Sequence, residues 1–190
     1  MTATRCRWAQ NSEIEAAYHD AEWGVPVHDD RTLFEFLTLE GAQAGLSWRT
    51  VLAKRAAYAR VFLDYDLPRL AALGDEELET RLSDPGIVRN RLKVWSVRSN
   101  ARAALALIEV EGSLDRYFWA WVGGQPIDGR RQSMAEVPAR TELSDRISKD
   151  LAKRGFKFVG STIVYAFMQA IGMVDDHLID CPGYRHRTAA

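Results

Sequence analysis

Two cysteines and two histidines stand near the ends of the chain in a pattern that suits a metal ion. Cys6 and His19 are thirteen residues apart, and His177 and Cys181 are four apart in "HLIDC". Two thiolates and two imidazoles form the ligand set of a closed tetrahedral zinc site. Residues at i and i+4 converge if their segment makes a helical turn. Four protein ligands leave no position for water, so we expect structural zinc; a Cys6–Cys181 disulfide or two inert thiols are the alternatives.

Glu40 is a second chemical signal, because it falls in the middle of an expected apolar helix face. On a helix, Leu33, Leu37, Glu40 and Ala44 lie within about 60° of one another. Burial raises the pKa of a carboxyl group unless a cation or several donors stabilise its charged form. Periodicity alone leaves two readings open. Glu40 is a functional carboxylate, or it pairs with a buried arginine or emerges at the helix end.

The segment "LEGAQAGLSW", residues 39–48, indicates a pocket for a planar ligand. Gly41 and Gly45 allow another group to approach the backbone closely, and Trp48 offers a flat face for stacking. Glycine and tryptophan also fill ordinary cores, so close packing is the alternative.

The segment "PGIVRNR", residues 85–91, lies between two expected helices and precedes a basic stretch. A Pro-Gly turn exposes backbone N–H groups at a helix N-terminus, which favours phosphate oxygens. The pattern looks like a helix-hairpin-helix that binds the DNA backbone irrespective of sequence; an ordinary helical corner is the alternative. The expected DNA contacts here are Gly86, Val88, Arg91 and Lys93.

Composition sets broad limits on the kind of protein. A chain of 190 residues with 47% hydrophobic residues can form one domain, or two lobes around a shared core. With no run of 18 apolar residues and no apolar stretch near the start, we expect a cytoplasmic protein without a membrane span. The net charge is −1, yet residues 81–190 carry 17 Lys/Arg against 12 Asp/Glu, which hints at a nucleic-acid partner. Solvated helix faces explain such an excess equally well.

Helical periodicity runs through nearly the whole chain, without sustained strand-like alternation, so we expect an all-α fold. Helix starts are expected at Asn11 or Ser12, at Asp29 or Asp30, and at Ser47, whose side chains can cap a first turn. Helices are expected up to about residue 22, then at 31–44, 48–63, 67–73, 76–83, 91–109, 114–122, 144–154 and 160–172. The proline- and glycine-containing stretch 123–140 is expected to be a long loop at a seam between two lobes of a single domain spanning 1–190.

With these segments assembled, the sequence closely resembles the constitutive bacterial 3-methyladenine DNA glycosylases, the DNA-3-methyladenine glycosylase I family of the helix-hairpin-helix superfamily. The resemblance runs nearly end to end. It rests on "AYHDAEWGVP", "LEGAQAGLSW", "DPGIVRNR", "KRGFKFVGSTIVYAFMQAIGMVDDH" and the cysteine-histidine ends. It implies the all-α glycosylase fold of that superfamily, with its helix-hairpin-helix near 76–102 and a zinc site joining the N- and C-terminal segments.

The resemblance also assigns residues. One structural zinc ion would be held by Cys6, His19, His177 and Cys181, and the alkylated-base pocket would be formed by Tyr18, Glu40 and Trp48, with Trp8 and Trp23 nearby. The sequence departs from the family pattern at Glu15, where we expect an aromatic residue in one wall of the pocket, and in a tail whose cysteines are reduced to Cys181.

The implied reaction releases 3-methyladenine from alkylated double-stranded DNA. Alkylation at N3 puts a positive charge on adenine and weakens the glycosidic bond, so binding the flipped-out base does much of the work. Glu40, the candidate catalytic residue, can accept a hydrogen bond from the adenine amino group, whereas the carbonyl oxygen of guanine would repel an ionised carboxylate. Trp48 would stack on the base, Tyr18 would close the pocket, and Leu46 is a candidate for filling the gap in the duplex.

The family lacks the catalytic aspartate of many superfamily relatives, so the resemblance implies that bound water attacks the sugar. We expect a monofunctional, monomeric enzyme without lyase activity. Two other classes remain open. One is a non-enzymatic DNA-binding protein in which Glu40 is a buried ion pair; the other is a zinc hydrolase, which the lack of an HExxH motif or an open three-ligand site disfavours.

Overall fold

The computed structural model describes residues 4–185 and is mainly helical over that range. Its α-helices are α1 (Glu13–Ala21), α2 (Asp30–Gln43), α3 (Trp48–Val61), α4 (Leu67–Ala72), α5 (Asp75–Leu82), α6 (Arg91–Glu111), α7 (Leu114–Ala120), α8 (Glu142–Lys153) and α9 (Ser161–Ala170). Single 3-10 turns form η1 (Arg7–Gln10), η2 (Leu63–Tyr65) and η3 (Met134–Glu136). Two short strands, β1 (Ile127–Asp128) and β2 (Val174–Asp175), complete the fold.

Side-chain caps fix the starts of the helices that carry the chemistry. Ser12 accepts the N–H of Glu15 at the start of α1, Asp29 accepts that of Thr32 at α2, and Ser47 accepts that of Thr50 at α3. These three expected caps are confirmed. A side-chain acceptor satisfies an N–H group that the first helical turn leaves unpaired, which is why local sequence predicts these starts well.

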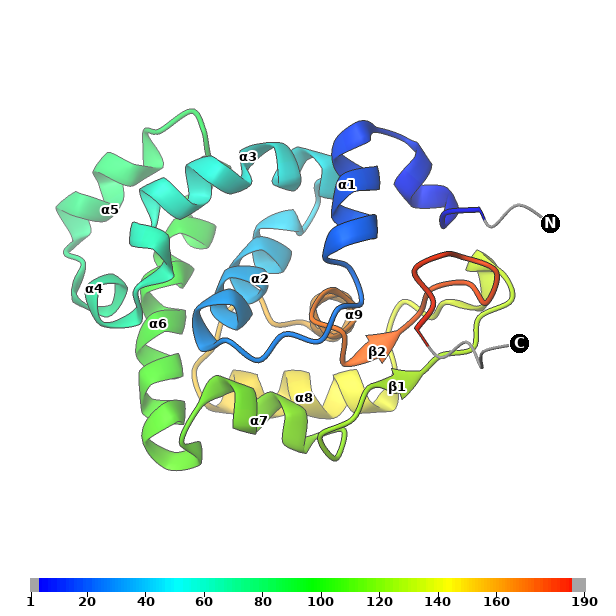
Figure 1. Cartoon of the computed structure of the whole chain (residues 1–190). Helices are drawn as coiled ribbons and strands as arrows, with labels where there is room; N and C mark the ends of the chain where they lie inside the picture. The colour runs from blue at the N-terminus through cyan, green and yellow to red at the C-terminus, as the bar shows by residue number, and fades with distance from the viewer. Residues whose placement is uncertain (1–3, 186–190) are drawn as a thin grey trace.

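Helices α2 and α9 form the centre of the molecule (Figure 1). Helix α2 packs against α3, α7 and α9, and its side chains are buried on nearly every side. Glu40 is only 4% exposed, between the fully buried Leu39 and the buried Gly41. The expected place of Glu40 within an apolar face is therefore confirmed.

Helices α5 and α6 form a corner at one end of the molecule, on the left in Figure 1. The stretch between them is residues 83–90, and α6 begins at Arg91, as the sequence predicts. Asn90 caps α6 by accepting the N–H of Lys93. The turn before α6 thus leads directly into a long helix that packs on α4, α5 and α7.

The stretch 123–140 is a loop only in part, which corrects one expectation. Strand β1 pairs in parallel with β2, joining Ile127 to Val174 and Asp128 to Asp175, and η3 follows. Two-residue strands are too short to show alternation, and their pairing joins residues far apart in sequence. The pairing lays this loop beside the C-terminal segment.

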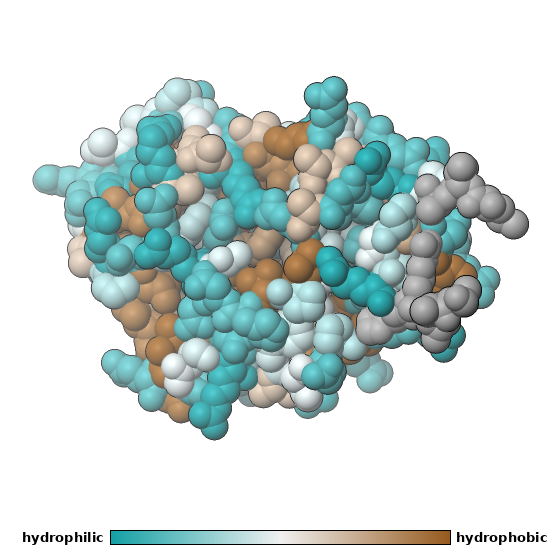
Figure 2. Space-filling view, viewed as in Figure 1, coloured by the Kyte–Doolittle hydropathy of each residue, from teal (hydrophilic) through white to brown (hydrophobic). Residues whose placement is uncertain are grey.

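The first and last described segments meet on the right in Figure 1. There the segment before α1 lies near the loop that follows β2, which brings Cys6 close to Cys181. The face seen in Figure 2 mixes hydrophilic and hydrophobic patches. None of the helices described in residues 4–185 is long and apolar enough to cross a membrane.

Candidate functional site: an aromatic cavity beside a cysteine-histidine cluster

A cavity of about 260 Å³ lies between α1, α2, α9 and the loop around η3. Its lining residues are Trp8, Glu15, Tyr18, Trp23, Glu40, Gln43, Trp48, Met134, Val137, Ala166 and Gln169. The volume exceeds the roughly 150 Å³ that suffices for benzene and lies just below the roughly 300 Å³ of pockets for drug-sized ligands. The cavity therefore suits a ligand of one bicyclic ring.

The structure brings together all five residues predicted for the base pocket. Tyr18 lies centrally, with its ring centroid 5.4 Å from that of Trp48 and 6.3 Å from that of Trp8. Trp8 meets Trp23 edge to face at 5.1 Å. Four elements supply this wall: η1, α1 with the turn after it, α2 and the first residue of α3. Such an aromatic lining favours a flat ligand.

Three polar atoms in this lining are buried and have no hydrogen-bond partner among the described residues. They are the Tyr18 hydroxyl, Glu40 Oε2 and Trp48 Nε1. A buried polar atom without a partner costs on the order of 1–3 kcal/mol, so proteins rarely leave one in that state. Three around one cavity indicate that a ligand completes their hydrogen bonds. The set combines two donors with a carboxyl group.

Glu40 has no ion pair within residues 4–185, which argues against the purely structural reading of this residue. Arg55, whose charge acts on the neighbouring Tyr18, is paired with other carboxylates: it donates to Glu22 at 2.6 Å and to Glu35 at 2.8 Å. Burial raises the pKa of Glu40 from 4.5 to about 8. Burial, followed by the nearby Glu40 carboxyl, also raises the pKa of Tyr18.

Sequence reasoning missed part of the cavity. Met134 and Val137 come from the loop around η3, and Ala166 and Gln169 come from one side of α9. A loop carries no periodicity that would assign it to a wall, and α9 looks like an ordinary core helix. Glu15, at which the sequence departs from the family pattern, does line the cavity; its carboxylate accepts the hydroxyl proton of Ser12 at 2.8 Å.

The cysteine-histidine cluster lies behind the tryptophan wall of this cavity. Ligand atoms of Cys6, His19 and Cys181 all lie within 4.8 Å of one another, and all three residues are buried. His177 adjoins them, with its ring centroid 4.8 Å from that of His19. Cys6 and Cys181 are not joined to each other, so the structure does not contain the alternative disulfide. The four predicted ligands are thus neighbours, three of them in one tight group.

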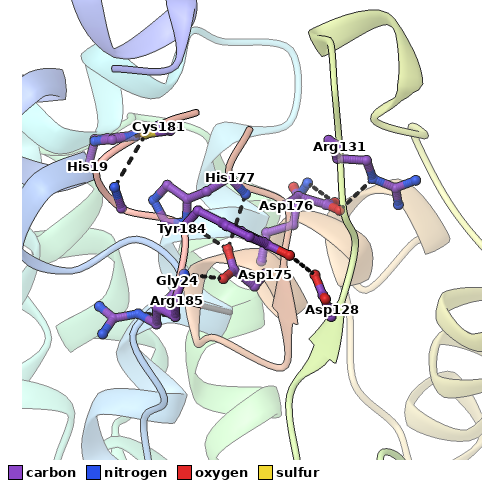
Figure 3. A network of polar contacts seen from close by, with 12 residues as sticks. His19, Gly24, Asp128, Arg131, Asp175, Asp176, His177, Cys181, Tyr184 and Arg185 are labelled. Carbon is purple, nitrogen blue, oxygen red and sulfur yellow. Dashed lines mark hydrogen bonds and ion pairs between the residues drawn. The ribbon is translucent and has the colours of Figure 1, made fainter. Parts of the chain in front are cut away.

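Both histidines of the cluster are oriented by carboxylates. His19 Nδ1 lies 2.9 Å from Asp20, and His177 Nδ1 lies 2.8 Å from Asp175 (Figure 3). The pairing of His19 leaves its Nε2 3.4 Å from Cys181 Sγ. His177 Nε2 is buried beside Gly183 without a hydrogen-bond partner in the described part of the chain. Metal-binding histidines commonly use one nitrogen for the metal and the other for a carboxylate.

The electrostatics of the cluster favour a thiolate. The Cys6 thiol donates toward Cys181, and His19 and the Gly183 N–H add further hydrogen bonds, which lowers the pKa of Cys181 to about 4. The same pairing raises the pKa of Cys6. A thiolate beside a thiol and imidazoles is a donor set that fits Zn²⁺.

A buried carboxylate next to the cluster holds the loop that forms one cavity wall. Asp176 accepts from Arg131 at 2.8 Å (Figure 3). It also accepts from the Tyr165 hydroxyl at 2.5 Å and from Gln169 at 2.7 Å. Arg131 begins the stretch that leads to Met134, and Gln169 itself lines the cavity. The segment carrying His177 therefore also anchors the wall of the cavity.

The predicted DNA contacts lie on the turn before α6, in the first turn of α6 and on the loop after α2. The N–H of Gly86 donates to the Asp84 carboxylate at 2.7 Å, and that of Val88 to the Tyr58 hydroxyl at 3.2 Å.

Arg91 is exposed and pairs with Glu79, while its guanidinium lies 4.0 Å above the Trp95 ring. Leu46 is 40% exposed on the loop. Lys93 is partly buried and donates to two backbone carbonyls.

Comparison with known proteins places this arrangement in context. A sequence model of a family described as methyladenine glycosylase matches residues 8–186. DNA-3-methyladenine glycosylase 1 of Escherichia coli (strain K12) is 45% identical over 180 residues, covering 95% of this chain and 96% of that protein.

Solved structures give the same result for the fold. A crystal structure of 3-methyladenine DNA glycosylase I superposes with a TM-score of 0.93 at 47% identity, covering 96% of this chain and 100% of that one. A variant of 3-methyladenine DNA glycosylase I in complex with 3-methyladenine gives a TM-score of 0.93 at 32% identity, covering 97% of this chain and 99% of that one.

Proposed function

This chain belongs to the methyladenine glycosylase family, a family of hydrolases of N-glycosidic bonds, and from that premise we propose that it releases 3-methyladenine from alkylated duplex DNA. The observation that carries the proposal is the cavity in which Tyr18, Glu40 and Trp48 each present a buried polar atom without a partner among the described residues. A flat base with hydrogen-bonding edges would supply those partners. The relative in complex with 3-methyladenine has the same fold.

Binding of a cationic base would change the ionisation of Glu40. With a pKa of about 8, the carboxyl group is mostly protonated near neutral pH while the cavity holds no base. A positive charge nearby favours the carboxylate. Glu40 would therefore ionise as 3-methyladenine enters from DNA and would then accept a hydrogen bond from the amino group of the base. Ionisation of Glu40 would thus accompany binding of the base, whereas the sequence alone suggested a carboxylate that is charged throughout.

The same carboxylate would discriminate between alkylated purines. An ionised Glu40 accepts from the amino group of adenine, whereas the carbonyl oxygen at that position of 7-methylguanine brings two acceptors together. A site that leaves buried polar groups unpaired with the wrong ligand discriminates strongly. Trp48 and Tyr18, whose rings lie 5.4 Å apart, would stack on the base and close the cavity.

We propose hydrolysis by water, without lyase activity. A lyase step needs an amine that forms a Schiff base with the sugar. The described residues that line the cavity include two carboxylates, Glu15 and Glu40, but no lysine. The alkylated base leaves as a neutral molecule, so cleavage needs less assistance than cleavage of an unmodified nucleotide.

The cysteine-histidine cluster would hold one structural zinc ion through Cys6, His19, His177 and Cys181. The free Nε2 of buried His177 and the thiolate character of Cys181 support this ligand set. With four protein ligands, zinc would stabilise the fold by joining the two end segments and would take no part in the hydrolysis.

The corner of α5 and α6 would act as a helix-hairpin-helix that binds the DNA backbone, with Gly86, Val88 and Arg91 as contacts and Leu46 filling the gap in the duplex. At Gly86 a carboxylate oxygen of Asp84 already occupies the amide, so a phosphate oxygen would have to replace it. A substitution at Gly86 is a poor test, because an added Cβ would lie 2.6 Å from that of Ala57. As a monomer acting on the chromosome, the enzyme would work in the cytoplasm.

Chromatography of the free bases released from methylated duplex DNA tests the proposal. The parent protein should release 3-methyladenine in preference to 7-methylguanine, and Glu40→Gln should lose part of that preference, since an amide can turn its NH₂ group toward a carbonyl oxygen. Binding of the DNA without release of any base would instead identify a non-enzymatic DNA-binding protein.

A further inference from the structure

A lysine from α6 holds the C-terminal end of α2, the helix that carries Glu40. Lys93 Nζ donates to the carbonyl oxygen of Ala42 at 2.9 Å and to that of Ala44 at 2.6 Å. Ala42 lies in the last turn of α2 and Ala44 directly follows Gln43, its last residue. The last carbonyls of a helix have no partner within the helix, and a cation there is favoured by the helix dipole.

Lys93 also lies immediately beyond the hairpin. It stands in the first turn of α6, where its own N–H is accepted by the side chain of Asn90. One residue therefore connects the proposed DNA-binding turn to a point two residues from Glu40. Beyond Ala44, Gly45 adopts a left-handed φ of +80° and leads to the exposed Leu46.

Helix α6 also reaches this part of α2 indirectly, through the segment that follows α8. The side chain of Asn100 donates to the carbonyl of Lys157 at 3.0 Å and accepts its N–H at 2.7 Å. The next residue, Phe158, packs closely on α2. A Cβ added at Gly41 would lie only 3.2 Å from the Cβ of Phe158. This close approach accounts for Gly41, and it links α6, through Lys157 and Phe158, to the C-terminal half of α2.

We propose that Lys93 is a positioning residue for base excision, which holds Glu40 and the Leu46 loop in place relative to the hairpin when DNA is bound. The inference rests on the proposed function. It gives Lys93 a different role from the phosphate contact expected from its sequence position, because a lysine that neutralises phosphate keeps its ammonium group in solvent. The ammonium of Lys93 is partly buried against two carbonyls, and burial lowers its pKa.

Lys93→Met is the sharpest variant, because methionine keeps most of the apolar stem and removes the charge. Arg91→Gln serves as a comparison, since Arg91 is exposed and is a proposed phosphate contact. Lys149→Met, at an exposed lysine on α8, controls for the general loss of a positive charge. Lys93→Arg tests rescue, as arginine can also donate to two carbonyls.

Four measurements separate the roles of Lys93. They are single-turnover release of 3-methyladenine from saturating methylated DNA, affinity for unmodified duplex across a salt series, affinity for free 3-methyladenine, and the melting temperature. The loss of two charge-assisted hydrogen bonds should slow base release by about tenfold to a hundredfold. Affinity for the free base should change much less, because that ligand needs the cavity but not its alignment with the hairpin.

The salt series distinguishes positioning from phosphate binding. Removing one phosphate contact lowers the slope of log affinity against log salt by about one. We expect that loss for Arg91→Gln, no change of slope for Lys93→Met, parent-like behaviour of Lys149→Met, and partial recovery of release in Lys93→Arg.

Two results would overturn the positioning role. A slope that falls by about one in Lys93→Met, with base release unchanged at saturating DNA, would make Lys93 a phosphate contact. A lower melting temperature with parent-like release from the folded protein would make it a stabilising residue only. A parent protein that released no base at all would remove the proposed function as well, whereas a parent that released it alongside an equally fast Lys93→Met would remove only the positioning role.

Discussion

The cavity and the cysteine-histidine cluster share a wall, yet their buried polar groups are satisfied in opposite ways. In the cavity, atoms of Tyr18, Glu40 and Trp48 have no hydrogen-bond partner in the part of the chain that the structure describes. In the cluster, His19 and His177 each have one ring nitrogen on a carboxylate. Buried polar atoms of the cavity thus lack hydrogen-bond partners, whereas one ring nitrogen of each histidine in the cluster has one.

This difference is the one we expect between a site for a transient ligand, the proposed base, and a site for a permanent ligand, the proposed zinc ion. Unpaired buried groups cost stability in the free protein, and the cost is recovered only when a ligand binds. Paired second nitrogens instead hold the histidines ready for a metal that stays bound. His177 Nε2 is the one nitrogen of the two imidazoles without a hydrogen-bond partner among the described residues. It is also the atom that would bind the proposed metal, so its lack of a partner agrees with this interpretation.

The two sites are joined physically by Trp23. Its ring centroid lies 4.5 Å from that of His177, and the same residue lines the cavity. Gly24 permits this contact: its φ is +73°, and a Cβ there would lie 2.8 Å from His177. We therefore expect damage to the cluster to reach the cavity through packing, and damage to the cavity to leave the cluster intact.

The largest effect is expected from Cys181→Ser. Loss of a metal ligand is among the few single changes that cost more than about 4 kcal/mol of unfolding free energy. Thermal unfolding and metal analysis of the purified variant would measure the loss. At low temperature, where the variant remains folded, base release should stay measurable, because the metal has no chemical role in our proposal.

A chelator applied to the parent protein is the matched experiment. The chelator should lower the melting temperature, as Cys181→Ser does, although the sequence is unchanged. If Cys181→Ser stayed fully folded and yet lost all base release, the metal would be catalytic, and the division between the two sites would be wrong.

Glu40→Gln should change how stability depends on pH. Since burial raises the pKa of Glu40 from 4.5 to about 8, the folded state keeps a proton that the unfolded state releases between those values. The stability contributed by this group is full below the lower value and is lost as pH rises through the higher one, at about 1.4 kcal/mol per pH unit. Glutamine has no such titration. Denaturant unfolding from about pH 5 to about pH 8 should therefore show that the free energy of unfolding of the variant rises relative to that of the parent as pH increases.

The exposed Glu109 on α6 provides the matched control for this experiment. Glu109→Gln removes the same carboxyl group from a position in contact with water, so its stability should follow the pH profile of the parent. A Glu40→Gln profile parallel to that of the parent would mean that Glu40 titrates normally and that its burial carries no electrostatic cost.

Glu40→Ala should weaken binding of free 3-methyladenine. The change leaves the amino group of the base without its acceptor beside buried side chains of the cavity, at a cost of about 1–3 kcal/mol, or roughly tenfold to a hundredfold in affinity. Calorimetric titration or fluorescence of the cavity tryptophans would measure the affinity. The melting temperature must be recorded alongside, because Glu40 is buried among core residues of α2. Unchanged affinity in a folded variant would show that Glu40 does not recognise the base.

Local signals explain how much of the fold could be predicted. The helix starts at Ser12, Asp29 and Ser47 could be predicted, because a capping residue and the turn that it caps are neighbours in sequence. The pairing of β1 with β2 joins distant parts of the chain, as Ile127 lies opposite Val174, and two-residue strands carry no pattern of their own. That pairing had to be seen in the structure.

The candidate site divides in the same way. Glu40 could be found because it interrupts an apolar face, and the cluster because cysteine and histidine are rare in this chain. Met134 and Gln169 could not be found, since tertiary contacts alone bring a loop and a core helix to the cavity. The role of Lys93 was hidden for a related reason: sequence places it beside the hairpin, but only the structure shows where its ammonium group points.

The smallest effects are expected from the carboxylates that orient the two histidines, and these two should differ. Asp175 is 1% exposed and also accepts the N–H of Arg185, whereas the side chain of Asp20 is 47% exposed and shared with Arg5 (Figure 3 shows the Asp175 side). Replacing such a partner commonly lowers metal affinity by about tenfold to a hundredfold. Asp175→Asn should fall in that range, and Asp20→Asn should fall below it, because water can take over the role of an exposed carboxylate. Competition with a chromophoric chelator would measure both affinities. Equal losses would mean that burial of the carboxylate does not matter, and no loss in either would mean that the metal alone orients the imidazoles.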